Sequence, residues 1–264
     1  MTKNLTAAAL ALCAGLFALG SGKAVSSRPI AIDAAEKLTP ACPASRPASI
    51  GALPNTQAAL SAGMPAIIVA LGSSSTYGSM SSATAHTYPA ELQRALNDEL
   101  PQAHIAVINR GIGGEDAPEE LARLQSDVIA VRPQLVIWQV GSNGAMRGDD
   151  PEVFRRQVTK GVELLHAAGA DVILMDNQRS PAVLAAPQHA SIEKALSEVA
   201  QATGASLFSR GALMDSWREQ GAPYLRFVSA DGLHHNDLGY RCVARALAVS
   251  IETAFSNRLM TSSN

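Results

Sequence analysis

The fold is decided by residues 66–76, which read Ala-Ile-Ile-Val-Ala-Leu-Gly-Ser-Ser-Ser-Thr. A continuous apolar run of strand length passes here directly into a glycine and three serines. Such an uninterrupted run is typical of a strand that helices cover on both faces of a parallel sheet. The glycine at its end permits a tight turn, which brings a polar side chain to the edge of the sheet.

Four further apolar runs follow, and amphipathic stretches of helix length separate them. The runs are Ile105–Ile108, Leu135–Val140, Val172–Met175 and Ser206–Phe208, and the predicted helices are Tyr88–Leu100, Pro118–Val131, Pro151–Leu165, His189–Thr203 and Asp237–Phe255. Regular alternation of strand and helix predicts right-handed crossovers. We therefore predict an α/β fold, a doubly wound three-layer sandwich around a mostly parallel five-stranded sheet.

Residues 1–24 have the pattern of a secretory signal peptide. Lys3 precedes an apolar run from Leu5 to Leu19, and small residues follow around Gly20. The run is shorter than the ~20 apolar residues that span a bilayer, so we expect no stable membrane insertion after cleavage. The sequence predicts a periplasmic or secreted protein, with a Pro-, Ala- and Ser-rich extension over residues 25–64 and a single domain over residues 65–264.

The chain has 264 residues, 47% of them hydrophobic, which is enough for one full core. A formal net charge of −2 gives no basic surface for nucleic acid. Removal of the signal peptide, and of Cys13 with it, leaves Cys42 and Cys242 in an oxidising compartment. A disulfide between them and two unpaired buried thiols are both compatible with the sequence.

Three polar blocks each follow a predicted strand, and a fourth precedes the last predicted helix. They are Gly72-Ser73-Ser74-Ser75-Thr76, Asn109-Arg110-Gly111-Ile112-Gly113-Gly114, Gly141-Ser142-Asn143 and Asp231-Gly232-Leu233-His234. In this order and spacing the set resembles the GDSL/SGNH hydrolase family. The resemblance covers the chain from about residue 65 onward and implies a flavodoxin-like SGNH hydrolase domain that needs no cofactor and no metal.

The resemblance also assigns roles to the residues at the matching positions. Ser74 is the expected nucleophile, His234 the base and Asp231 the carboxylate that orients the base. The expected oxyanion hole consists of the backbone N–H groups of Ser74 and Gly114 and the side-chain amide of Asn143.

The sequence departs from the family pattern at three positions. Ser73 replaces the aspartate of the Gly-Asp-Ser motif, and Gly144 follows Asn143 where aspartate is common. Because Ser75 also flanks Ser74, the residues alone leave the choice of serine open. His235 stands where the family often has proline, which places a second candidate base beside His234.

These residues predict an extracytoplasmic serine esterase that acts through an acyl-enzyme on a small-molecule or glycan ester, including an acetylated cell-surface polysaccharide. One alternative is a carbohydrate-binding module that keeps the fold without the reaction. Another is a metal-dependent phosphoesterase built on Asp231, His234, His235 and Asp237, which is disfavoured because no other block supplies ligands. The sequence gives no indication of oligomeric state.

Overall fold

The computed structural model describes residues 41–45, 48 and 50–261. The predicted signal peptide and residues 25–40, 46–47 and 49 of the predicted extension therefore lie outside the described residues. The strands are β1 (Ala66–Gly72), β2 (Ile105–Gly111), β3 (Leu135–Gln139), β4 (Asp171–Met175) and β5 (Ser206–Phe208). All pairings are parallel, in the order β2-β1-β3-β4-β5. The predicted α/β class and parallel five-stranded sheet are confirmed.

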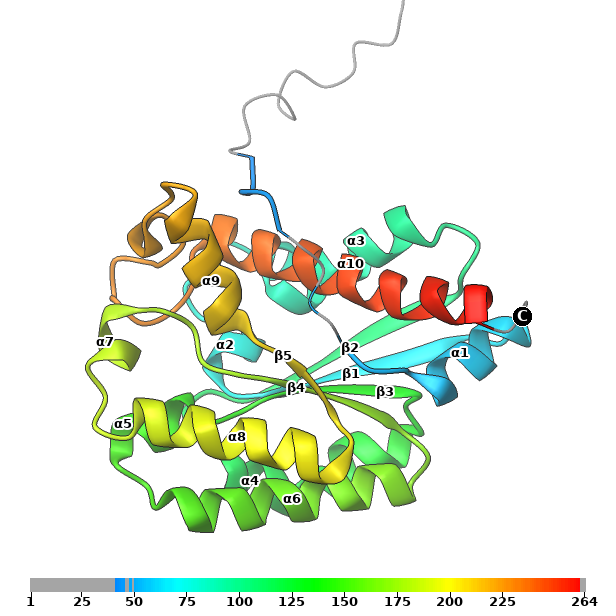
Figure 1. Cartoon of the computed structure of the whole chain (residues 1–264), viewed down its shortest axis with the longest axis horizontal. Helices are drawn as coiled ribbons and strands as arrows, with labels where there is room; N and C mark the ends of the chain where they lie inside the picture. Colours follow the sequence, from blue (N-terminus) through cyan, green and yellow to red (C-terminus); the bar gives the residue numbers. More distant parts are fainter. Residues whose placement is uncertain (1–40, 46–47, 49, 262–264) are drawn as a thin grey trace, which may run out of the picture. The chain divides into compact units, whose positions relative to one another are not determined.

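Helices cover both faces of this sheet (Figure 1). The longer ones are α1 (Pro54–Ser61), α3 (Tyr88–Glu99), α6 (Pro151–Ala167), α8 (His189–Thr203), α9 (Arg210–Glu219) and α10 (Asp237–Thr261). The shorter ones are α2 (Ser74–Tyr77), α4 (Ala117–Ala122), α5 (Ser142–Arg147) and α7 (Pro181–Leu184). None of the helices within the described ranges combines the length and the apolar character that crossing a bilayer requires.

Successive strand residues point to opposite faces, so the sheet separates two apolar cores. On one side Ile137 packs in a cluster with residues of α3, α9 and α10. On the other side Trp138 packs with residues of α4, α6 and α8. Every residue of β3 is buried, because helices cover both faces of this strand. This explains why the strands appear in the sequence as continuous apolar runs.

The helix predicted over Pro118–Val131 is interrupted. Helix α4 ends at Ala122, and a π turn (Leu124–Val128) and a 3-10 turn (Ile129–Val131) follow. The break lies at Arg123, whose guanidinium binds the Glu115 carboxylate and the carbonyl oxygen of Arg110. These contacts hold the segment against the loop after β2 and interrupt the regular helical pattern.

The compact unit that contains the sheet also includes the described residues before the predicted domain boundary at residue 65. Helix α1 belongs to this unit, although its N-cap residue provides no side-chain hydrogen bond. The cap comes instead from Asp171 in β4, whose carboxylate accepts hydrogen bonds from the backbone N–H groups of Asn55 and Thr56. Residues before 65 are thus held by contacts that are remote in sequence.

A disulfide joins Cys42 to Cys242 in α10, with 5.4 Å between the two Cα atoms. It closes a covalent loop over a sequence separation of 200 residues. Of the two states that the sequence left open, the structure contains the bridge. The bridge attaches the N-terminal part of the described chain to the last helix.

Candidate active site

Three of the four polar blocks meet at the carboxyl edge of the sheet. In the parallel register Gly72 of β1 lies opposite Gly111 of β2 on one side and Gln139 of β3 on the other. The segments that follow these three strands are therefore neighbours. This edge is where ligands bind in open α/β sheets.

Ser74 begins α2 directly after the turn that ends β1. A side chain at Gly72 would not fit there, because its Cβ would lie 2.7 Å from the carbonyl oxygen of Gln139. Ser73 is buried and donates to the Gln139 side-chain oxygen, with 3.1 Å between the oxygen atoms. Ser75 is also buried. Of the three serines, Ser74 is the one whose hydroxyl contacts His234.

Ser74, His234 and Asp231 form a continuous chain of hydrogen bonds. His234 Nε2 lies 2.7 Å from Ser74 Oγ, and His234 Nδ1 lies 2.6 Å from Asp231 Oδ2. An ionised carboxylate only accepts hydrogen bonds, so Nδ1 must carry the proton and Nε2 is left to accept from the serine hydroxyl. This is the tautomer that a base for Ser74 requires.

The loop itself holds the Asp231 carboxylate in place. Its second oxygen, Oδ1, accepts hydrogen bonds from the backbone N–H groups of Leu233, at 3.0 Å, and His234, at 3.1 Å. Partial burial acts to raise the pKa of Asp231, but the hydrogen bonds from the His234 ring and from the two backbone groups outweigh it. The pKa of Asp231 is lowered below its usual range. The carboxylate therefore stays ionised beside the imidazole.

His235 is directed away from Ser74 and into the protein interior. Its side chain is 1% exposed, and its Nδ1 lies 3.0 Å from the carbonyl oxygen of Phe227. Burial, together with the positive charge of Arg210, lowers the pKa of His235 to about 3. His235 is thus a neutral, buried side chain, and the structure brings His234 to the serine.

The four residues considered as metal ligands do not converge. Asp237 accepts hydrogen bonds from Ser82 and lies 3.0 Å from His86 Nδ1. Asp231, by contrast, contacts the His234 ring. Within the described part of the chain, no group of three or more His, Cys, Asp or Glu residues could hold a metal ion.

Two of the three blocks expected to provide the oxyanion hole, those of Gly114 and Asn143, are linked to each other. Asn143 Nδ2 donates a hydrogen bond to the carbonyl oxygen of Glu115, at 2.7 Å. Glu115 is the residue that follows Gly114. Gly114 has a φ of +84°, a conformation that favours glycine. An amide nitrogen carries two hydrogens, so Asn143 keeps one for a ligand.

Asp116 is a site residue that we did not predict. Its buried carboxylate accepts hydrogen bonds from the backbone N–H groups of Gly141, at 3.0 Å, and Gly144. It thereby joins the loop that contains Gly114 to the turn that contains Asn143. The sequence does contain a signal, because Asp116 and Glu119 form a capping box at the start of α4.

A family model described as the Non-GDSL lipase-like family matches residues 40–257. The description agrees with the presence of Ser73 where the motif has aspartate. Among curated proteins, an arylesterase of Vibrio mimicus is 29% identical over 100 residues, which is 36% of this chain and 50% of that protein. The chain thus spans about half the length of the curated relatives it matches.

Solved structures with the same fold include a two-domain esterase active on acetylated mannans. That structure has a TM-score of 0.67 and 24% identity, over 79% of this chain and 56% of that one. An acetylxylan esterase from Geobacillus stearothermophilus has a TM-score of 0.60 and 19% identity, over 70% of this chain and 94% of that one. At these identities the likeness is evidence for the fold.

Proposed function

The chain belongs to the Non-GDSL lipase-like family of the GDSL/SGNH hydrolases, and from this membership and the site geometry we propose that it is an extracytoplasmic serine esterase. The observation that carries the proposal is the chain of contacts from Asp231 through His234 to Ser74, with 2.6 Å and 2.7 Å between the bonded atoms. A carbohydrate-binding module would have no need of a base held against a serine hydroxyl.

In the first half of the proposed reaction, Ser74 Oγ attacks the ester carbonyl carbon while its proton passes to His234 Nε2. The carbonyl oxygen becomes an oxyanion, which accepts hydrogen bonds from the N–H groups of Ser74 and Gly114 and from Asn143 Nδ2. Asp231 stabilises the imidazolium. Return of the proton to the alkoxide leaving group breaks the ester bond and leaves an acyl group on Ser74.

In the second half, water attacks the acyl carbon and gives a proton to His234 Nε2. Collapse of the second tetrahedral intermediate breaks the bond to Ser74 Oγ, and His234 returns the proton to that oxygen. The products are a carboxylic acid and the free serine. Apart from the ester and the water molecule, both halves use groups that the chain itself supplies.

For the substrate we propose a short-chain ester of a polar alcohol, in particular an acetylated polysaccharide. Support comes from the solved structures with this fold, two of which are described as esterases of acetylated mannans and of acetylxylan. The proposed periplasmic or secreted location rests on residues 1–24. It is supported by the Cys42–Cys242 bridge, because such bridges persist in oxidising compartments.

Two assays test the proposal on the purified protein. A panel of p-nitrophenyl esters from acetate to longer acyl chains, run beside acetylated mannan and acetylated xylan, is expected to give the highest kcat/KM with acetate and to release acetate from the glycans. A fluorophosphonate probe should label the protein and should fail to label the Ser74→Ala variant. Absence of both hydrolysis and labelling would favour the binding module, and loss of activity with a chelator would favour the phosphoesterase.

A further inference from the structure

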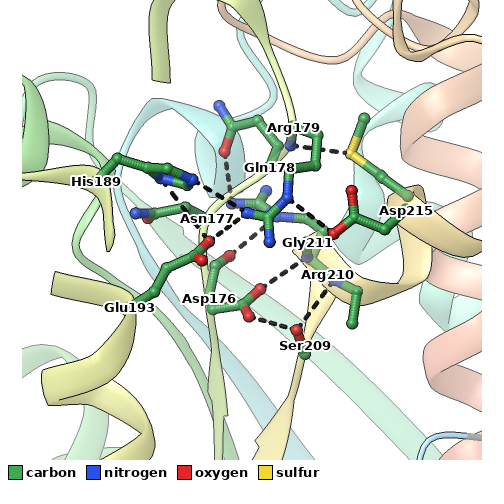
Figure 2. Close-up of polar contacts among 12 residues, drawn as sticks. Asp176, Asn177, Gln178, Arg179, His189, Glu193, Ser209, Arg210, Gly211 and Asp215 are labelled. Carbon is green, nitrogen blue, oxygen red and sulfur yellow. Dashed lines mark hydrogen bonds and ion pairs between the residues drawn. The ribbon is translucent and has the colours of Figure 1, made fainter. Parts of the chain in front are cut away.

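A buried polar network lies at the carboxyl end of β4 (Figure 2). The strand ends at Met175, and Asp176, Asn177 and Gln178 follow it with 6%, 1% and 1% exposure. Their burial and their hydrogen bonds indicate a role in holding neighbouring segments in place.

Gln178 connects this network to the acid–base loop. Its Nε2 donates to the carbonyl oxygen of Leu233, at 3.0 Å, across a sequence separation of 55 residues. Leu233 lies immediately before His234, and its own N–H donates to the Asp231 carboxylate. The Gln178 amide thus holds the middle of the segment that carries the base and its carboxylate.

Arg210 fixes the direction in which the Gln178 amide points. The guanidinium is 1% exposed, and its Nη2 donates to Gln178 Oε1 at 2.7 Å, as Figure 2 shows. A guanidinium offers only donors, so it must face the amide oxygen, and the amide nitrogen must then face Leu233. A carbonyl oxygen only accepts, so the opposite amide orientation would leave both neighbours unsatisfied.

Arg210 is itself held in a defined position. Its Nε donates to the carbonyl oxygen of Asp176 at 3.1 Å. The Asp176 carboxylate accepts hydrogen bonds from Ser209 and from the backbone N–H of Gly211, the two residues that flank Arg210. Three hydrogen bonds thus join Asp176, at the end of β4, to Ser209, Arg210 and Gly211, at the start of α9.

The same amide oxygen also faces the turn that carries Asn143. Ser142 Oγ lies 3.3 Å from Gln178 Oε1 and 2.9 Å from Asn177 Oδ1. Ser142 directly precedes Asn143, the expected donor to the oxyanion. One buried side chain thus lies between the base loop and the oxyanion turn and contacts both.

We propose that Gln178, oriented by Arg210, is a positioning residue that keeps His234 in register with Ser74 and with the oxyanion turn. This inference rests on the proposed esterase function. Without the bond to Leu233 the loop loses one of its contacts with the segment that follows β4, and the bond between His234 and Ser74 lengthens. Displacement of a catalytic group by about 1 Å lowers turnover by up to about 10²-fold.

The main test is Gln178→Glu, which keeps the shape and the oxygen that faces Arg210. The carboxylate pairs with the buried guanidinium but presents an oxygen where Leu233 needs a donor. We expect kcat for p-nitrophenyl acetate to fall about 10- to 100-fold, with KM changed less than about 3-fold, because substrate binding does not use this loop contact. The rate of fluorophosphonate labelling of Ser74 should fall by the same factor.

Gln93→Glu is the matched control, since Gln93 bridges backbone groups in the same way at the start of β2 and takes no part in the network around Gln178. Its Nε2 donates to the carbonyl oxygen of Ile105 at 2.9 Å, and its Oε1 accepts from the backbone N–H of Val107 at 2.7 Å. The kcat of this variant should stay within about 3-fold of wild type. Gln178→Met, which removes both polar ends at similar volume, is the second variant and should lose kcat as Gln178→Glu does, with the circular dichroism spectrum of wild type.

A double-mutant cycle with His234 distinguishes positioning from general destabilisation. In a His234→Ala background, Gln178→Glu should cause no further loss of the residual turnover, because the contact acts through His234. A second loss of equal size in that background would overturn the inference, as would near-normal kcat in both Gln178 variants or an equal loss in Gln93→Glu. An inactive, unlabelled wild type would instead contradict the proposed function itself.

Discussion

The Cys42–Cys242 bridge offers a stability prediction whose size follows from the structure. Reduction of the bridge leaves both sulfur atoms in place and removes only the covalent link between the N-terminal segment and α10. The link closes a loop over a sequence separation of 200 residues. For a loop of this length the chain-entropy model gives about 5 kcal/mol of stability, and native-state strain or residual structure in the unfolded chain lowers that figure.

The assay is urea unfolding of a Cys13→Ala protein, followed by far-UV circular dichroism with and without reductant. With a slope of about 2–3 kcal/mol per M, the loss corresponds to a midpoint lower by up to about 2.5 M urea in the reduced protein. The Cys42→Ala/Cys242→Ala variant is the control, because its midpoint should not respond to reductant. A reduced midpoint within about 0.3 M of the oxidised one would refute the reasoning that the bridge constrains the unfolded chain.

Three further predictions concern the oxyanion side of the site and the buried network. Asn143→Ala should lower kcat by about 10²–10³-fold in a p-nitrophenyl acetate assay, since it removes one oxyanion donor. Asp116→Asn should lower kcat as well, because an amide cannot accept from both backbone groups that the carboxylate binds. Glu120→Gln is the control and should keep wild-type kcat. Glu120 is a buried residue of α4 whose carboxylate accepts a hydrogen bond from Trp138 Nε1. Burial raises the pKa of Asp176 from 3.8 to about 6, because it disfavours the charged carboxylate. The contribution of Asp176 to the stability of the folded state is therefore largest below about pH 4 and is lost as the pH rises through about 6. Relative to Asp176→Asn, the free energy of unfolding of wild type should therefore fall by about 2 kcal/mol between pH 4 and pH 8.

The strands and the first three blocks could be predicted because their signals are local. Each strand is buried on both faces and is therefore a continuous apolar run, and the residues that follow it must lie at one edge of the sheet. The family spacing then selected Ser74 and His234 from neighbours of the same type. The structure gives the physical reason for that choice, since Ser73 faces Gln139 and His235 faces Phe227.

The features that sequence reasoning missed depend on contacts between distant residues. Helix α1 receives its cap from Asp171, more than 100 positions away, so no local capping signal marks its start. Gln178 meets Arg210 and Leu233 at separations of 32 and 55 residues. A glutamine and an arginine near strand ends resemble ordinary surface residues until the fold buries them. Asp116 could have been found, because its capping box is visible in the sequence.

The central claim is that His234, and not its neighbour, takes the proton from Ser74. The most direct test compares kcat/KM for p-nitrophenyl acetate in His234→Ala and His235→Asn, where asparagine keeps a donor for the Phe227 carbonyl. We predict a loss of about 10⁴-fold or more in His234→Ala and a value within a few-fold of wild type in His235→Asn. Substantial activity in His234→Ala together with an inactive but folded His235→Asn would contradict the account.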